Sequence, residues 1–511
     1  MRSNSEVPPD PSDQVELNQF SDSPNHLSPL SSPMPNSAPS VRSRANEDLA
    51  HSAGHVCTSA LSLALRALAF PAVALTSRKL QRALLAVVVL NISWQIQKHF
   101  FLREDLANLG SLGGLQVSLT NVALVGLYVA WLIESVTHCG SSESEKRQSG
   151  PVTLPAALFL SFCALSLLVA GDATLGVFEV VSILERFLLY IYIVNKVSSR
   201  EDVLFVTRVL LIGLIIQSVL MLAQAGGLLP TFDWYGIKAR TDFAGDSRVS
   251  GTLGSPNPAA AYLAMCMVFA FSVLLSGVRR FDKCLSGIAL SVALLPLFFT
   301  LSRGGWLSFF AGFITVLLVS RFRAPRKLVA IAFVAFILVA ISLSGPVHER
   351  LVGDDRGSAA SRIPLNKLAL AMIEDHPLLG VGSNNFSVAM QPYLAHALTG
   401  DDFVYTVHNT YLRVWAETGI GGLIAYVWFL LSILQRAFRV WQLRDYVLAF
   451  MSLGCAAAII GLMVQMNFEP FRGDAAGHMI WLFAGMVTVM YRLSLKSRSF
   501  PSASVSAVLR P

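Results

Sequence analysis

The feature that most limits the fold of this chain is a series of long apolar segments, repeated along most of its 511 residues. Each runs for about 17–25 residues, the length that a helix needs to cross a hydrocarbon core about 30 Å thick. Backbone groups in lipid must form their hydrogen bonds inside the protein, which favours helices. The alternating pattern of a membrane β-barrel is absent from the sequence. The sequence therefore predicts an all-α polytopic membrane protein.

Composition supports this prediction and excludes several classes of function. The chain is 54% hydrophobic and only 14% charged, whereas a soluble protein is about 25% charged. The net charge of +7 is scattered over short loops between apolar segments, which is a topology signal rather than a nucleic-acid-binding patch. The six cysteines lie far apart and show no disulfide or metal spacing. We therefore expect membrane lipids, and no nucleic acid, as partners.

Twelve transmembrane spans are expected from the apolar segments. A further segment, 57–75, contains Arg66 and Pro71, and we interpret it as an interfacial helix, with a thirteenth span as the alternative. The expected spans are 82–99, 118–137, 152–170, 178–197, 203–225, 257–277, 283–300, 303–320, 327–345, 413–436, 446–466 and 474–493.

The domain organisation follows from these spans. Residues 1–54 are rich in Ser and Pro and predict a disordered tail, residues 55–495 form the membrane domain, and 496–511 form a second tail. Basic residues fall in alternate loops, which places both tails in the cytoplasm. The longest loop, 346–412, then lies on the outer face, and such loops are usually functional. It contains a helix-like segment with an apolar face, "SRIPLNKLALAMIEDHP".

Arg303 lies in "LFFTLSRGGWLSFF", between two apolar runs that almost touch. A charge is costly so near the bilayer. Snorkelling of the side chain to the interface is one explanation. Binding of a lipid-borne phosphate is the other, because a guanidinium presents a planar fork of donors to phosphate oxygens.

Arg248 opens "RVSGTLGSPNPAAAYL", on the outer side of the next span. One interpretation is a loop with good turn chemistry, in which Ser255 or Asn257 caps the helix and Pro258 fits its first turn. The other is an anion site that uses Arg248. In the loop 346–412, Arg356 and Arg362 could join such a site or remain solvated.

The stretch "HNTYLRVWAETGIGG" places His408 at the start of a helix. The helix dipole disfavours an imidazolium there, so a neutral ring that accepts a proton is expected at pH 7, with a capping or interfacial histidine as the alternative. Arg413 and Glu417 are spaced i,i+4 and are expected to neutralise each other. The glycines of "TGIGG" predict close packing or a bend.

Four motifs, in this order and spacing, give the chain a resemblance to the O-antigen ligase family, which includes O-antigen polymerases and bacterial O-oligosaccharyltransferases. The resemblance covers about residues 80–495. The motifs are "RVSGTLGSPN", "LSRGGWLSFFAGF", "DHPLLGVGSNNF" and "HNTYLRVWAETGIGG".

The resemblance implies a GT-C-like glycosyltransferase of the bacterial inner membrane with its active face in the periplasm. It implies transfer from an undecaprenyl-pyrophosphate-linked glycan donor without metal or other cofactor and with inversion. The acceptor would be lipid A–core for a ligase, another glycan for a polymerase, or a protein serine for an oligosaccharyltransferase. The catalytic residues that the resemblance implies are Arg248, Arg303 and His408. As substrate-binding residues we expect Arg248, Arg303, Arg356, Arg362 and Asn409.

Two alternatives remain open on the sequence. A transporter of lipid-linked glycans would also be polytopic, but such proteins usually show internal repeats or broken helices at mid-membrane, and no clear repeat is visible here. Within the enzyme class, the sequence favours a ligase or oligosaccharyltransferase over a polymerase and does not identify the acceptor.

Overall fold

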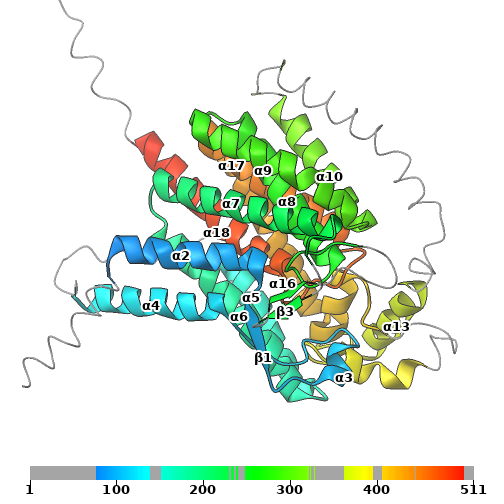
Figure 1. Ribbon diagram of the computed structural model, residues 1–511. Coiled ribbons are helices and arrows are strands. Elements are labelled where there is room, and N and C mark those ends of the chain that lie inside the picture. The colour runs from blue at the N-terminus through cyan, green and yellow to red at the C-terminus, as the bar shows by residue number, and fades with distance from the viewer. Residues whose placement is uncertain are drawn as a thin grey trace, which may run out of the picture. The chain divides into compact units, whose positions relative to one another are not determined.

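The computed structural model describes most of the chain between residues 76 and 499 (Figure 1). The predicted tail 1–54, the segment 57–75 and, apart from its first residue, the expected span 327–345 lie outside the described residues. The described residues are 76–137, 151–229, 232–234, 237–239, 248–321, 323, 327, 362–394, 405–443 and 445–499.

Eight of the described helices are long and apolar enough to cross a membrane. They confirm the prediction of a helical, multi-pass membrane protein. They are α4 (Leu119–Thr137), α7 (Arg200–Ala225), α8 (Pro256–Leu275), α9 (Arg280–Phe299), α10 (Arg303–Ser320), α16 (Thr410–Trp441), α17 (Tyr446–Gln465) and α18 (Ala475–Ser499).

Three further helices coincide with expected spans but fall short in length or carry more charge. These are α2 (Arg78–Trp94), α5 (Thr153–Leu165), which continues as the 3₁₀-helix η1 (Ser166–Val169), and α6 (Ala173–Lys196). With the ninth expected span outside the described residues, the total of twelve stays a prediction.

The span expected at 82–99 ends earlier than the apolar run suggested. Helix α2 stops at Trp94 because Gln95 adopts a left-handed conformation (φ 51°) and closes the last turn. The chain then forms an antiparallel hairpin of β1 (Gln97–Phe100) and β2 (Leu115–Ser118), with the short helix α3 (Glu104–Ala107) between them. A second small hairpin pairs β3 (Phe232–Trp234) with β4 (Ile237–Ala239).

Helix α8 is the most buried of the eight long helices and packs against α9, α10 and α17 (Figure 1). Small residues allow this approach, as is usual in membrane helix packing. A Cβ added at Gly305 would lie 2.3 Å from the Cβ of Ala260, and one at Gly461 would lie 2.3 Å from the carbonyl oxygen of Ser308. The starts of α8 and α10 and the end of α17 are therefore held close together.

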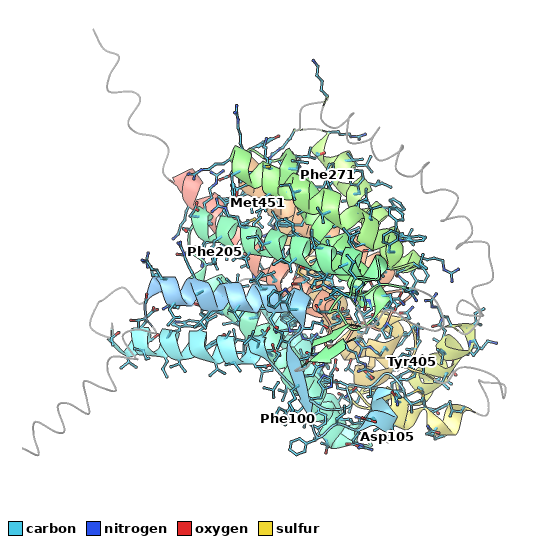
Figure 2. The ribbon with its side chains drawn as sticks, in the orientation of Figure 1. Phe100, Asp105, Phe205, Phe271, Tyr405 and Met451 are labelled. Carbon is cyan, nitrogen blue, oxygen red and sulfur yellow. The ribbon has the colours of Figure 1, made fainter. Side chains whose placement is uncertain are left out.

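The helix predicted in the long outer loop is confirmed. Helix α13 (Arg362–Asp375) buries one face and packs against α16. It is followed by α14 (Phe386–Ala389) and the 3₁₀-helix η2 (Gln391–Tyr393). Figure 2 labels Tyr405, whose ring lies 5.2 Å from that of His408. The buried face of α13 consists of Leu365, Leu368, Ala369, Met372 and Ile373.

The bend expected from "TGIGG" is a break in α16 at Gly419 (φ 70°, ψ −177°). The break frees two carbonyl groups, and the turn before α14 uses them. Val381 N donates to the carbonyl oxygen of Ala416 (2.9 Å) and Gly382 N to that of Glu417 (3.0 Å). The motif "DHPLLGVG" is thus bonded directly to the start of α16.

Candidate active site

Arg248 lies between the start of α8 and the end of α9. Its Nε donates to the carbonyl oxygen of Thr300 (2.8 Å), and its Nη2 donates to Oδ1 of Asn257 in the first turn of α8 (2.8 Å). The predicted capping role of Ser255 or Asn257 is wrong: Ser255 holds the N-cap position without a side-chain hydrogen bond, and the Asn257 amide serves the tertiary contact instead.

Arg303 is the first residue of α10, and its side chain is half-buried. The helix is capped by Ser302, whose Oγ accepts from Gly305 N (3.2 Å). Gly304 lies against the end of α17, since a Cβ added there would be 3.3 Å from Cγ of Gln465. This packing brings Arg303 to the same end of the bundle as Arg248.

His408 precedes α16, and its Nδ1 lies 3.2 Å from the carbonyl oxygen of Thr406. A carbonyl only accepts, so this hydrogen bond places the proton on Nδ1 and leaves a lone pair on Nε2. Burial lowers the pKa of His408 below its usual value; the Thr406 carbonyl opposes this, and the positive charge of Arg362 adds to it. The ring is therefore neutral at pH 7 and able to accept a proton, as predicted from the sequence.

Asn409 is the N-cap of α16. Its Oδ1 accepts from the backbone N–H groups of Tyr411 (2.9 Å) and Leu412 (3.1 Å). This cap fixes the helix start directly beside His408. The described bonds of Asn409 are those of a helix cap, and its contact with substrate stays a prediction.

Glu469 is the functional candidate that the sequence did not single out. It is buried in the segment 466–474 between α17 and α18. Its Oε1 accepts from Nδ2 of Asn257 (2.6 Å) and lies 3.6 Å from Nη2 of Arg362. Its backbone carbonyl accepts from the hydroxyl of Thr410. Through these contacts Glu469 joins the surroundings of Arg248, Arg362 and the start of α16.

Four predicted residues therefore gather at one end of the bundle. Asn257 contacts both Arg248 and Glu469, and Glu469 lies beside Arg362. The positive charge of Arg362 contributes to the lowered pKa of His408. Arg303 is connected to the same residues by packing: its neighbour Gly304 lies against Gln465. Nε2 of Gln465 in turn donates to the carbonyl oxygen of Asn257 (3.3 Å). Arg356 lies outside the described residues.

The sequence did contain one signal for Glu469. The segment "NFEPFRGD" places two acids and an arginine between two apolar spans, where charges are costly and usually functional. The packing of α17 beside α8 and α10 determines which of these charged residues, Glu469, Arg472 or Asp474, contacts the site. The sequence alone does not specify that packing.

Several buried polar atoms around this site have no hydrogen-bond partner among the described residues. Buried polar groups are usually satisfied, so each such atom needs an explanation. Their grouping at the place where the predicted residues meet is consistent with a site that receives a polar ligand. They are Arg362 Nε, Thr406 Oγ1 and Gln465 Oε1.

Glu469 gives this site a measurable pH dependence. Burial raises the pKa of its carboxyl to about 7, against the opposing effect of Arg362 and Arg248. Because the folded-state pKa is above the ordinary value of 4.5, the stability contributed by the bound proton is complete below pH 4.5 and is lost as the pH rises through 7. We expect the wild type to lose about 3 kcal/mol relative to Glu469→Gln over this range.

Melting temperatures of both proteins in detergent, measured from pH 5 to pH 8, test this expectation. His408 is present in both proteins, and its own titration cancels in the comparison. Parallel melting-temperature curves for the wild type and Glu469→Gln would show that Glu469 does not titrate in this range.

Comparison with known proteins agrees with the motifs. A protein-family model described as O-antigen ligase matches residues 288–427, which include Arg303, Arg362, His408 and Asn409. No curated protein matches the chain. A chain from a structure entitled "Structural coordination of polymerization and crosslinking by a peptidoglycan synthase complex" is 17% identical, with 67% of this chain and 97% of that chain covered and a TM-score of 0.38. A similarity of that size defines neither fold nor function.

The family match covers part of α9, all of α10, the segment that contains α13, and the start of α16. It agrees with the ordered motifs and with the multi-pass helical fold. Residues 288–427 of the chain therefore match the O-antigen ligase family.

Proposed function

We propose that the protein transfers a glycan from an undecaprenyl-pyrophosphate carrier to an acceptor hydroxyl at the periplasmic face of a bacterial inner membrane. We propose a ligase-type reaction with lipid A–core as the acceptor. A polymerase or a protein O-oligosaccharyltransferase is the alternative within the same chemistry.

One observation supports this proposal most strongly. Arg248 and Arg362 lie around the buried carboxyl of Glu469 at one end of a membrane helix bundle. The neutral His408 lies near Arg362, and Arg303 begins α10 at the same end. Guanidinium groups bind phosphate oxygens with a geometry that an ammonium group does not offer. A histidine with a free Nε2 lone pair supplies the base that an attacking hydroxyl requires.

The proposed reaction is a single displacement. The acceptor oxygen attacks the anomeric carbon from the face opposite the diphosphate while the bond from that carbon to the diphosphate oxygen breaks. The diphosphate leaves with the electron pair, and Arg248, Arg303 and Arg362 stabilise its charge. Nε2 of His408 takes the hydroxyl proton. The configuration at the anomeric carbon is therefore inverted.

Glu469 affects donor binding in this scheme because its carboxyl lies beside Arg362, where an anion would bind. An ionised carboxylate there would repel an arriving diphosphate. With a pKa of about 7, Glu469 can take up a proton near neutral pH, which removes that repulsion and frees Arg362 for the donor.

The proposal is tested by reconstituting the purified protein with an undecaprenyl-pyrophosphate-linked glycan and an acceptor. Covalent attachment of long glycan to lipid A–core supports the ligase, extension of the carrier-linked glycan supports the polymerase, and attachment to a serine peptide supports the oligosaccharyltransferase. Movement of the donor across vesicles without any covalent product would support a transporter and refute the proposed enzyme.

Replacing Arg303 by lysine tests how the donor is held. Lysine keeps the charge and the ability to reach the interface but loses the planar fork. We expect the catalytic efficiency with the lipid-linked donor to fall about tenfold or more, because charge-assisted bonds of this kind contribute about 1.5–3 kcal/mol each.

The measurement is kcat/KM for the donor at saturating acceptor, with Arg321→Lys at the other end of α10 as the matched control. Unchanged donor use by Arg303→Lys would mean that Arg303 only extends to the membrane interface.

A further inference from the structure

Three polar residues of the motif "HNTYLRVWAETGIGG" form a stripe on α16 that faces the segment 466–474. Thr410, Arg413 and Glu417 are spaced i, i+3, i+7, which places them on one helical face. Each of them binds the segment. Thr410 N donates to the carbonyl oxygen of Met466 (2.8 Å), and Nη2 of Arg413 donates to that of Phe471 (2.7 Å).

Thr410 binds the segment at two further points. Its hydroxyl donates to the carbonyl oxygen of Glu469 and accepts from the N–H of Phe471 (3.2 Å). The backbone on both sides of Pro470 is thereby bonded to a single side chain at the start of α16, two residues after His408.

Glu417 binds the same segment through charge. Its carboxylate accepts from Nη1 of Arg413 (2.9 Å), as the sequence predicted, and also from both terminal nitrogens of Arg472, one of them at 3.2 Å. Arg472 also lies 3.5 Å from Glu179, and Nη1 of Arg186 donates to the Arg472 carbonyl (2.7 Å). All five side chains are buried.

Such a cluster needs a reason beyond stability. Burying charged groups costs solvation free energy that their attraction often fails to exceed, and apolar replacements are frequently as stable. Four of the five side chains, all but Glu417, line a cavity of about 40 Å³, which has room for water. The contacts of the cluster with the backbone of 469–472 point to a role in holding that segment in one place.

The segment is important because it carries Glu469. The carboxyl of Glu469 contacts Asn257 and Arg362, and Asn257 in turn contacts Arg248. A shift of the segment would therefore move the partners of two of the proposed donor-binding arginines relative to His408.

We propose that Thr410, Arg413, Glu417 and Arg472 form a clamp that positions Glu469, and through it the donor-binding arginines, relative to His408. These are positioning residues and do not touch the substrate. The kinetic part of this inference rests on the proposed function; the structural part does not.

Hydrogen exchange of the segment 466–474 tests the clamp without any activity. Thr410→Val removes only the hydroxyl, and Glu417→Gln removes only the charge. We expect peptides covering 466–474 to exchange at least severalfold faster in both variants. Should Glu417→Gln fail to fold, Thr410→Val still gives the result.

The matched control is Asp282→Asn, which removes the charge of a buried carboxylate on α9 that pairs with Arg208 of α7. Asp282 binds Nε of Arg208 (2.7 Å) and is as buried as Glu417, but it does not contact the segment. We expect this variant to leave exchange in 466–474 unchanged. Equal exchange in the wild type and in Thr410→Val, or equal acceleration in Asp282→Asn, would overturn the clamp.

A kinetic cycle tests whether the clamp acts through Glu469. A displacement of about 1 Å at a reacting group can lower the rate about 100-fold, and we expect Thr410→Val to lower kcat about 10-fold or more with a smaller change in KM for the acceptor. In a Glu469→Ala background, which lacks the contacts with Asn257 and Arg362, the same substitution should add little, because coupled residues are not additive. Full additivity of the two substitutions would overturn the proposed path.

The transfer assay and the exchange experiment test the proposed function and the clamp independently. If the wild type transfers no glycan from a lipid-linked donor, the proposed function fails while the exchange experiment still decides the clamp. If transfer occurs but exchange in 466–474 is insensitive to Thr410 and Glu417, the clamp fails and the proposed function stands.

Discussion

Replacing His408 by glutamine is expected to reduce glycan transfer by about 10²–10⁴-fold, the usual contribution of a general base. The glutamine amide can still donate to the carbonyl oxygen of Thr406, which the His408 Nδ1 contacts in the wild type (3.2 Å). The substitution therefore removes the proton-accepting Nε2 while it leaves local packing nearly intact.

The pH dependence of the wild type gives the same residue a second signature. Because burial holds the pKa of His408 below its usual value of 6.5, the ring stays neutral throughout the neutral range. We expect the acid limb of the kcat/KM profile to lie below pH 6.5, with activity lost as His408 gains a proton. The limb should be missing from the residual activity of His408→Gln.

The control for this experiment is His376→Gln. His376 is exposed at the end of α13, so the same chemical change is made on the same outer segment but away from the site. We expect its transfer rate to match that of the wild type. Transfer by a folded His408→Gln at the rate of His376→Gln would remove His408 from the mechanism.

Replacing Gly419 by alanine is expected to destabilise the protein by at least about 3 kcal/mol. Gly419 has φ 70° and ψ −177°, a backbone region that is essentially restricted to glycine. An added Cβ would also lie 1.9 Å from the carbonyl oxygen of Leu378, a backbone atom that cannot rotate away. Conformational strain and steric overlap therefore act together at this position.

Two control substitutions separate these causes. Gly227 has a similar φ of 69° but open space around an added Cβ, so Gly227→Ala reports the conformational cost alone. Gly287 in α9 has an ordinary φ and open space, so Gly287→Ala should be neutral or slightly stabilising. Melting temperatures in detergent should fall in the order Gly287→Ala, Gly227→Ala, Gly419→Ala. Equal values for the last two would show that the contact with Leu378 yields freely.

The break at Gly419 matters for the site because it exposes the carbonyl groups of Ala416 and Glu417 to Val381 and Gly382. These bonds fix the segment after α13 against α16. A protein that cannot form the break is expected to displace α13, and with it Arg362, from Glu469. The loss of stability and the loss of function should therefore coincide in Gly419→Ala.

The hairpin after α2 shows where sequence patterning fails. The apolar residues near Phe100 extend the apolar run, so the run predicts a helix to residue 99. The structure ends the helix at Trp94 and pairs 97–100 with 115–118. This pairing satisfies backbone groups across 14 or more residues of intervening chain, and no local pattern within the run encodes it.

Elements with a local cause can be predicted from the amino-acid sequence alone. The apolar runs specify membrane helices because backbone groups in lipid must bond within the protein. The spacing of Leu365, Leu368, Ala369 and Met372 specifies the buried face of α13, and the i,i+4 spacing specifies the pair Arg413–Glu417. The order and spacing of the four motifs were also sufficient to predict the family.

The contacts between polar groups, in contrast, depend on how the helices pack. Asn257 stands at a position suited to capping, yet it binds Arg248 and a carboxylate 212 residues later in the chain. Glu417 has one partner, Arg413, that helical spacing predicted. Its second partner, Arg472, follows the end of α17 in the sequence. The physical reason is the same in both cases: a buried charge takes the partner that helix packing brings within reach, and the close approach of α8, α10, α16 and α17 is a property of the whole bundle.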